Sequence, residues 1–492
     1  MKVQKKVIVI GSGFAGLSAA TFMSKAGWKV TVLEKQNTPG GRARQLKDGG
    51  FTFDMGPSWY WMDDVFERYF AQFGKKAGDY YSLERLSPSY RIYWEKEFSD
   101  IPSNYNAFKN LLEGWEPGAA EKLEKFLTEA EFKYRVGIQK LVFKPGLSVS
   151  EFIDWDVMKG MFRLDVFTSI KKHIRKYFRH PRIRQLLEFP ILFLGALPEN
   201  TPALYSLMNY ADIVGGTWYP KGGMYSVVNG MYKLAVESGV EFRFGEAVTK
   251  IELQLNAAKY VHTAMGIYEA EAVIGGADYQ FIENQLLPVS HRTYSDKYWD
   301  KRLMAPSCLL YYVGINKRLE NILHHMLFFD VPFENHAQEI YTTKQWPSDP
   351  LFYVSASSLT DNTVAPDGCE NLVFLIPVAA GMSDDTEEIR EKYFQLILRR
   401  FEKHIGQSVA DNIVYKKSFA YTDFVREYNS FKGNAYGLAN TLLQTAIFRP
   451  RCRSRKVSNL FYTGQLTVPG PGVPPSLISG EVVANEVIKS FG

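Results

Sequence analysis

The sequence predicts an α/β fold in which a parallel-sheet domain is interrupted by an α+β domain, and three observations support this prediction. An apolar run at Val7–Ile10, typical of a buried strand, leads directly into a glycine-rich turn and a helix of small residues. A second apolar run, Val30–Leu33, follows that helix and ends on an acidic residue. Near the other end, Asn459–Tyr462 has a strand pattern and precedes a Pro/Gly stretch and a last helix. Strands that alternate with helices in this way are typical of parallel sheets.

The composition is that of a globular protein of more than one domain. A domain usually holds about 100–200 residues, so the 492 residues indicate two or three domains. Hydrophobic residues make up 46% of the chain and charged residues 23%, which leaves ample material for a core. The net charge of +5 is too small for a dedicated nucleic-acid binder, and no nucleic-acid partner is expected.

The cysteine and histidine pattern argues against disulfides and metals. Cys308, Cys369 and Cys452 lie far apart without a CxxC motif, which fits a reducing compartment. His324 and His325 are adjacent and point in different directions, so no metal site is predicted. The N-terminal stretch does not have the pattern of a signal peptide, and no window of about 18 apolar residues predicts a membrane span. The expected location is the cytoplasm.

The first strand, turn and helix form a dinucleotide-binding motif. The motif needs a strand, GxGxxG, a helix, a second strand and an acid, and all five occur in order. The first glycine permits the tight turn, the second lets the backbone approach a pyrophosphate, and the third lets the helix pack closely. The helix N-terminus then presents N–H groups to the phosphates, and the acid accepts from a ribose. The residues so assigned are Gly11, Ser12, Gly13, Phe14, Ala15, Gly16, Glu34 and Lys35.

A second glycine pair favours FAD over NAD. The stretch Thr38–Arg44 contains Gly41 and Arg42, whose backbone and guanidinium suit a diphosphate that is held permanently. The strand pattern Phe51–Asp54 then runs into another close backbone approach, plausible for a flavin ring. That second approach is made by Gly56, Pro57 and Ser58.

These residues resemble the bacterial carotenoid desaturases of the phytoene desaturase type, flavoproteins related in fold to amine oxidases. The N-terminal block VIVIGSGFAGLSAATFMSKAGWKVTVLEKQNTPGGRAR is shared by several such families. Later blocks narrow the resemblance: AVIGGAD, APSCLLYYVGINKRL, GNAYGLANTLLQTAIFRP and YTGQLTVPGPGVPPSLISGE. The family commonly has His-Pro-Gly where this chain has Val468, Pro469 and Gly470, and Asn where it has Gly276. Any mechanism that uses that histidine is therefore in doubt here.

The resemblance implies further cofactor contacts. Val248 would hold the adenine end through its backbone, and Gly464 would end a strand of the same sheet as Val7–Ile10. The Pro/Gly stretch would then cross the flavin, and the last helix, from Val473 and Pro474, would direct its N-terminus to the cofactor. Both ends of the chain would close on one FAD.

The predicted domains are discontinuous. A Rossmann-like FAD-binding domain, a parallel sheet with a hairpin layer, is assembled from residues 1–85, 220–285 and 451–492. Residues 86–219 form a helical region that faces the substrate and the membrane, and residues 286–450 supply the sheet and helices of the substrate domain.

The helical region contains a basic run with two interpretations. Arg163–Gln185 carries eight basic residues against one acid, with apolar residues at helical spacing, and the apolar run Phe189–Leu197 follows. This pattern fits either a solvated basic face over core or an amphipathic helix on an anionic membrane surface. The resemblance favours the membrane, at the inner face of the cell membrane, since the family's substrates dissolve in lipid.

The resemblance implies an enzyme that desaturates a long apolar polyene. Trp59–Met62 is either a lining of the substrate pocket or core. A hydride leaves one carbon for the flavin and a proton leaves its neighbour, yet no catalytic residue is identified. Asp423 and Glu427 are interpreted as solvated carboxylates. The final electron acceptor is oxygen or a quinone.

Several activities remain open from the sequence. The preferred reaction is stepwise conversion of phytoene toward lycopene. Desaturation at the 3,4 bond of a later carotenoid and flavin-dependent carotenoid isomerisation are alternatives, and an amine oxidase is less favoured. A prenyl-chain escort without enzyme activity would not need the complete glycine set or Arg42.

Overall fold

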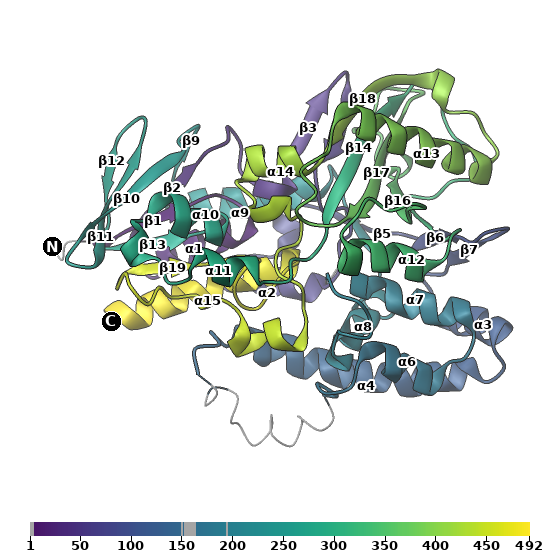
Figure 1. Cartoon of the computed structure of the whole chain (residues 1–492), viewed down its shortest axis with the longest axis horizontal. Coiled ribbons are helices and arrows are strands. Elements are labelled where there is room, and N and C mark those ends of the chain that lie inside the picture. Colours follow the sequence, from purple (N-terminus) through teal and green to yellow (C-terminus); the bar gives the residue numbers. More distant parts are fainter. Residues whose placement is uncertain (1–3, 149–150, 152–163, 193–194) are drawn as a thin grey trace.

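The computed structural model describes residues 4–148, 151, 164–192 and 195–492, which form two lobes side by side. Figure 1 shows a parallel sheet in the left lobe, a larger sheet at the upper right, and a layer of helices below that sheet. This arrangement confirms the predicted α/β class.

The first lobe is built on a five-stranded sheet in which all neighbouring strands run parallel. Its order is β19 (Leu460–Tyr462), β13 (Ala272–Gly275), β1 (Lys6–Ile10), β2 (Lys29–Glu34) and β9 (Glu241–Phe244). Strands from three distant parts of the chain thus meet in one sheet, as the sequence predicts for the cofactor domain. The strand before the Pro/Gly stretch lies two positions from β1, in the expected sheet.

Each face of this sheet is covered by a different layer. One face packs against helices α1 (Phe14–Lys25), α9 (Met224–Glu237) and α15 (Val473–Phe491). The other face packs against an antiparallel layer of β10 (Val248–Gln254), β11 (Ala257–Thr263) and β12 (Ile267–Glu269). The strands β1, β13 and β19 are apolar and buried on both faces because both faces are covered, whereas the edge strand β9 has the sequence EFRF and is partly exposed. The predicted hairpin layer is therefore present.

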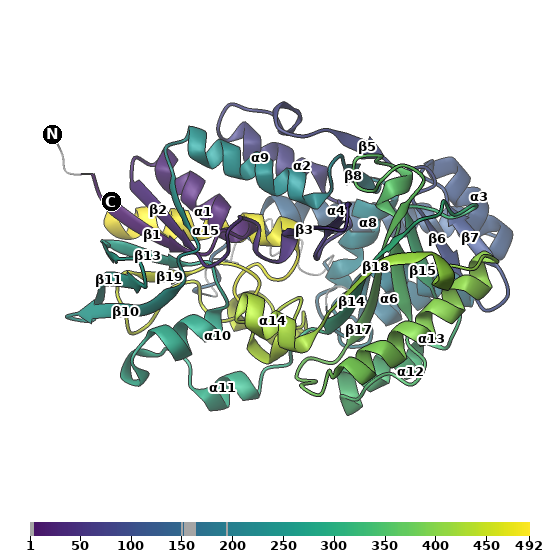
Figure 2. The same cartoon turned by 90° about the horizontal axis from the view of Figure 1, so that it is seen from above.

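The second lobe is a seven-stranded sheet with mostly antiparallel neighbours. In order across the sheet, its strands are β18 (Ile413–Phe419), β14 (Ser307–Ile315), β17 (Glu370–Val378), β16 (Phe352–Ser355), β15 (His325–Phe328), β6 (Tyr90–Tyr93) and β7 (Phe98–Ile101). One face packs against α13 (Glu387–Ile405), which lies on the side away from the parallel-sheet lobe (Figure 2). The other face of this sheet faces the space between the two lobes.

The region predicted as helical begins with strands. β6 and β7, within residues 86–219, complete the sheet that residues 286–450 otherwise form. The helices start only at α3 and are α3 (Tyr105–Trp115), α4 (Ala119–Gln139), α6 (Ile170–Tyr177), α7 (Pro181–Leu192) and α8 (Leu207–Ile213). The sequence analysis missed these strands because each has only four residues. About half of the apolar residues that would mark them are aromatic rather than aliphatic.

The basic run does not form one continuous amphipathic helix. Chain direction changes between α6 and α7, at the extended residue Phe178, and Arg163 lies outside the described residues. Ile170 and Ile174, on the apolar side of α6, are fully buried, and Phe189, Ile191 and Ala196 are buried as well. Residues 193–194 of the apolar run also lie outside the described part. The apolar side of α6 is thus protein core, whereas Phe167, which precedes α6, is exposed together with several of the basic residues of the segment.

The remaining helices and strands connect these layers. They are β3 (Gln45–Asp48), β4 (Phe51–Asp54), α2 (Asp63–Ala71), β5 (Leu83–Arg85), β8 (Trp218–Pro220), α10 (Tyr279–Phe281), α11 (Asp296–Asp300), α12 (Phe333–Gln338) and α14 (Tyr421–Tyr428). Among the described residues, no helix is both long and apolar enough to span a membrane.

Candidate functional site

A cavity of about 540 Å³ lies where the parallel sheet meets the seven-stranded sheet. Its walls come from the glycine-rich turn, the ends of β2 and β13, the loop after β4, α14, and the stretch before α15. Gly16 does not line it. The other predicted cofactor-binding residues all do: Gly11, Ser12, Gly13, Phe14, Ala15, Glu34, Lys35, Gly41, Arg42, Gly56, Pro57, Ser58, Val248, Gly464, Val473 and Pro474.

The three motif glycines have different physical roles. Gly11 adopts φ +94°, which favours glycine. A Cβ on Gly16 would lie 2.0 Å from the carbonyl oxygen of Gly11, so only glycine lets α1 start this close to the turn. A Cβ on Gly13 would meet no atom within 4 Å, because this residue faces the open cavity. α1 begins without a side-chain cap, so its first N–H groups and its dipole are left for an anion.

Glu34 is held in place by the turn. The backbone N–H and the hydroxyl of Ser12 both donate to Oε2 of Glu34 at 2.7 Å, and the N–H of Gln36 donates to Oε1 at 2.8 Å. A carboxylate has about four acceptor positions, so further hydroxyl groups can still donate to it. Lys35 also lines the cavity, and its ammonium donates to the carbonyl of Arg426 at 2.6 Å and ties β2 to α14.

Arg42 has the properties expected of a diphosphate ligand. Its Nη2 donates to the hydroxyl of Ser430 at 3.0 Å and to the carbonyl of Asn434 at 3.3 Å, while its buried Nε has no partner among the described residues. Burial lowers the pKa of Arg42 and raises the pKa of Asp278, and each charge partly offsets the effect on the other. A buried guanidinium with an unused donor, beside a glycine turn and an uncapped helix, fits the diphosphate of a dinucleotide.

The opposite wall is apolar and comes from one face of the seven-stranded sheet. Cys308 and Leu310 on β14, Leu375 on β17 and Tyr353 on β16 line it, because alternate residues of a strand face the same side. Trp59, Trp61 and Met62 complete this wall with Met55 and Met208, while Tyr60 is core. Trp59–Met62 is thus partly a lining of the pocket and partly core, so each of the two interpretations holds for some of its residues.

The sequence analysis missed the contribution of α14 and of the loop after it. Phe424, Glu427 and Tyr428 line the cavity, and the guanidinium of Arg42 lies 5.5 Å from the ring centre of Tyr428. The interpretation of two acids as solvated was wrong. Asp423 is buried and pairs with Arg390 at 2.8 Å, and Glu427 accepts from Arg44 at 3.1 Å.

Other missed lining residues are scattered through the chain. Ala277 and Asp278 follow β13, and Tyr436 and Gln465 come from late loops. The block similarity at residues 272–278 and 433–450 pointed to these segments but not to single side chains. No local pattern marks them, because their proximity arises from the tertiary fold.

The C-terminal segment closes the cavity as expected. Gly464, with φ +108°, follows β19, and α15 starts at Val473 with Pro474 and Pro475 in its first turn. Proline carries no N–H, and the N–H of Ser476 donates to Gly472, so the first turn of α15 offers a ligand only the N–H of Val473. The N-terminus of α15 therefore offers the cofactor fewer N–H donors than the sequence analysis expected.

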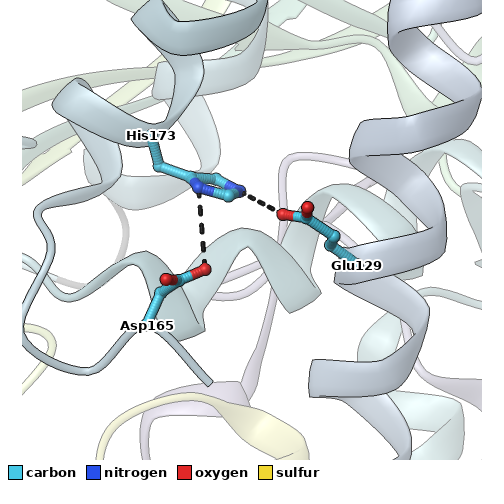
Figure 3. Close-up of side chains that lie close together, drawn as sticks. All are labelled: Glu129, Asp165 and His173. Atoms are coloured by element: carbon cyan, nitrogen blue, oxygen red, sulfur yellow. Dashed lines mark ion pairs between the residues drawn. The ribbon is translucent and has the colours of Figure 1, made fainter. Parts of the chain in front are cut away.

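One cluster outside the cavity has the composition of a metal site. Figure 3 shows His173 of α6 between Glu129 of α4 and Asp165, at 3.4 Å and 3.8 Å. The fully buried ammonium of Lys133 lies 2.9 Å from Asp165 and 3.4 Å from the His173 ring. Burial, together with the charge of Lys133, lowers the pKa of His173 to about 4. The ammonium already sits where a cation would bind, so this cluster links α4 to α6 as an ion-pair network.

A dinucleotide cradle facing an apolar wall, across the carboxyl ends of a parallel sheet, defines the class of FAD-dependent oxidoreductases. The chain belongs to the family of flavin-containing amine oxidoreductases, whose model matches residues 14–488.

Known relatives agree over nearly the full chain. A carotenoid 3,4-desaturase from Haloarcula japonica is 40% identical over 99% of this chain and 98% of its own. A zeta-carotene-forming phytoene desaturase from Myxococcus xanthus is 30% identical, over 98% of this chain and 94% of its own. The solved structure of an oxidoreductase from Methanosarcina mazei shares the fold, with a TM-score of 0.64 at 16% identity, over 98% of this chain and 100% of its own.

Proposed function

We propose that this protein is a carotenoid desaturase that introduces a carbon–carbon double bond into a long polyene. The observation that carries the proposal is the two-sided cavity, with a diphosphate cradle on one side and an aromatic and aliphatic wall on the other. A carotenoid has almost no polar handle, so recognition depends on the shape of an apolar lining. The charged lining residues all belong to the turn, to the ends of β2 and β13, or to α14: Glu34, Lys35, Arg42, Asp278 and Glu427.

We favour the 3,4 bond of a carotenoid as the position of desaturation. The Haloarcula japonica 3,4-desaturase is 40% identical to this chain, against 30% for the Myxococcus xanthus phytoene desaturase. Conversion of phytoene toward lycopene is the second candidate, and the Myxococcus relative supports it.

In this proposal, the cavity-lining residues predicted from the sequence hold the FAD. Gly16 contributes indirectly, because it lets α1 start close to the glycine-rich turn. Residues 1–85, 220–285 and 451–492 form the cofactor domain, and residues 86–219 and 286–450 form the substrate domain. The shared parallel sheet supports the first assignment. The extension of the seven-stranded sheet by β6 and β7 supports the second.

The bound flavin supplies the chemistry of hydride acceptance. The protein holds the polyene against the cofactor and excludes water. Trp59 and Trp61 line the apolar wall, with their ring centres 5.2 Å apart. Positioning of this kind accounts for much of an enzyme's rate enhancement when the substrate itself stabilises the developing charge, as a polyene does. Oxygen or a quinone then reoxidises the flavin.

Anaerobic reduction of the holoprotein by defined carotenoids tests this function. Liposomes carry either phytoene or a carotenoid saturated at the 3,4 bond, and flavin absorbance and product mass are measured. We expect the flavin to bleach and the product to lose two hydrogen atoms. Bleaching by amines alone would indicate an amine oxidase, and isomerised product of unchanged mass an isomerase. Readmission of oxygen or of a quinone identifies the acceptor.

We also propose that the protein binds peripherally to the inner face of the cell membrane. Helices α4 and α6 and the segment around residues 442–448 lie along one edge of the molecule (Figure 1). Phe167, Leu443 and Phe448 on this edge are 84%, 71% and 51% exposed. Lys172, Arg175 and Lys176 of α6, the helix that follows Phe167, are also exposed. Exposed apolar side chains among basic residues suit an anionic bilayer.

Vesicle co-sedimentation tests this docking. We expect binding to vesicles with anionic lipid, weaker binding to neutral vesicles, and loss of binding in the double variant Phe167→Ser, Leu443→Ser. Leu255→Ser is the matched control, because Leu255 is 95% exposed on the distant β10–β11 turn. Equal loss of binding in the control, or no loss in the double variant, would contradict this surface assignment.

A further inference from the structure

The apolar wall of the cavity contains one hydroxyl group with an imidazole directly behind it. Tyr353 of β16 lines the cavity, and His325 of β15 lies on the same face of the sheet. The antiparallel register pairs His325 with Ser355, which places Tyr353 diagonally opposite. Nδ1 of His325 lies 2.7 Å from the Tyr353 hydroxyl oxygen, so the two groups share a hydrogen bond.

The imidazole is buried and packed against an aromatic ring. His325 is fully buried and stacks on Trp59, itself a lining residue, with ring centres 4.2 Å apart and planes 13° apart. Its Nε2 has no partner among the described residues. Burial lowers the pKa of His325 well below its usual range and raises the pKa of Tyr353, so both groups are neutral.

Desaturation requires a group that takes a proton beside the flavin. Loss of a hydride from the polyene leaves a cation, and a C–H bond next to a cationic carbon is strongly acidic. Such a proton needs only a weak base, provided that the base lies within reach. A neutral buried imidazole is sufficient, although it would be a poor base for an ordinary C–H bond.

Other polar groups on this wall suit the task less well. Burial raises the pKa of the Cys308 thiol to about 12, and its bond to the Tyr436 hydroxyl is long, at 3.9 Å. The hydroxyl of Ser58 reaches only the carbonyl of Gly56 at 3.5 Å, in addition to Tyr353 itself. Tyr353 is the lining residue that has a basic nitrogen within hydrogen-bond distance.

We infer that Tyr353 is a catalytic residue of the proposed desaturation and passes the substrate proton to His325. This inference rests on the proposed function. One C–H bond breaks with its electron pair leaving as hydride to the flavin, the two-electron oxidant. The neighbouring C–H bond breaks as its proton moves to the Tyr353 oxygen and the Tyr353 proton moves to Nδ1 of His325. The electron pair of that second bond becomes the new double bond, so the polyene loses two electrons and the flavin gains them.

Histidine-specific NMR tests the pair without flavin or substrate. Nitrogen-15 spectra of the protein report which ring nitrogen of His325 carries the proton, and the His325→Gln spectrum assigns the signal. We expect the proton on Nε2, with Nδ1 accepting from Tyr353, and a shift of the Nδ1 signal in Tyr353→Phe. A proton on Nδ1 would overturn the inference, because that nitrogen could not then accept.

Single-turnover kinetics test the catalytic role. We expect Tyr353→Phe and His325→Gln to slow anaerobic flavin bleaching by about 100-fold, the usual range for loss of a proton-transfer group. Flavin content and polyene uptake should be unchanged. Deuterium at the carbon that loses the proton should slow the variants more than the wild type, because deprotonation becomes limiting.

A matched variant separates chemistry from packing. Tyr311→Phe removes an equally buried hydroxyl from the opposite face of the same sheet, where it donates to the carbonyl of Arg390. We expect this variant to bleach at the wild-type rate. Wild-type rates in Tyr353→Phe, or an unchanged isotope effect, would overturn the inference while leaving the proposed function intact. Failure of every carotenoid to bleach the wild type would overturn both.

Discussion

At the scale of single residues, some side chains near the glycine-rich turn are placed to bind the cofactor, and others stabilise the surrounding structure. Arg42 lines the cavity, whereas its near neighbour Arg44 does not and donates to Gln36 at 2.8 Å and to Glu427 at 3.1 Å. We therefore expect the removal of these two arginines, which are two positions apart, to have different effects on FAD binding.

We expect Arg42→Met to weaken FAD binding by about 10- to 100-fold, since a hydrogen bond to a charged group is worth about 1.5–3 kcal/mol. Arg44→Met should change the dissociation constant little, because Arg44 does not line the cavity. Equilibrium dialysis of FAD against each purified protein measures both. Equal loss in the two variants would show that the guanidinium acts through the fold.

The glycines allow a second residue-scale prediction. Gly16→Ala should lower the melting temperature of the protein without FAD, because its Cβ would overlap the Gly11 carbonyl. Gly13→Ala should fold normally, since Gly13 has φ −69° and open space at its Cβ, but should bind FAD more weakly because the methyl group enters the cradle. Calorimetry and FAD titration separate the two effects. Comparable melting points in the two variants would contradict this division of roles.

Residues in local motifs could be predicted from the sequence, and those brought together by tertiary folding could not. The GxGxxG spacing and the acid after the second strand identified Gly11 to Ala15 and Glu34, because strand, turn, helix and second strand are consecutive in the chain. Tyr353, Tyr428 and Asp278 lie far apart in the chain and carry no local signature. Their place in the cavity follows from the pairing of distant strands.

At the scale of elements, one ion-pair network fastens α13 to the seven-stranded sheet. Asp330, just after β15, accepts from Nε of Arg400 at 3.0 Å and from Nε2 of His404 at 2.9 Å. Burial pushes the pKa of Asp330 upward, but the bonds from His404 and Arg400 outweigh it and hold the pKa at about 2. Arg400 and His404 stand one helical turn apart on α13 and so reach the same carboxylate.

This network predicts a pH-dependent stability. The folded pKa lies below the usual value near 3.8, so the stabilisation is present above that value and is lost as the pH falls toward 2. Asp330→Asn should lower the unfolding free energy at neutral pH by about 2 kcal/mol and flatten its fall in acid. Urea unfolding at several pH values measures this, with the exposed Asp349→Asn as control. An unchanged acid profile in Asp330→Asn would contradict the network's role.

The break in the basic run shows what element prediction lacked. The spacing of apolar residues indicated one helix. A proline, however, disfavours helical backbone at the residue before it, and Pro181 starts α7. The proline was visible in the sequence, so the boundary could have been predicted. Whether the apolar side faced core or lipid could not, since that depends on α4 packing beneath it.

At the scale of the whole molecule, both ends of the described chain contribute to one cavity. α1 and α15 pack side by side, and a Cβ on Gly480 would lie 2.4 Å from the carbonyl of Ala15. The cofactor sheet could be predicted because its segments carry recognisable blocks. The sheet of the second lobe was only partly predicted, because β6 and β7 precede the rest by more than 200 residues.

We expect FAD to protect both ends of the chain together. In hydrogen exchange, residues 10–17, 34–42 and 464–476 should all slow on FAD binding, because they line the same cavity. Helix α13 should be unchanged, since it covers the far face of the other sheet. Protection limited to the N-terminal segments would contradict a cofactor shared by the two ends.

The position of β19 also determines when the coenzyme can be acquired. Ribosomes deliver β1 and β2 first, and β19 emerges after every other strand, yet β19 and β1 flank the same strand, β13. A nascent chain therefore exposes a half-built pocket throughout its synthesis. The complete cavity for FAD is therefore expected to form only after the C-terminal segment has been synthesised.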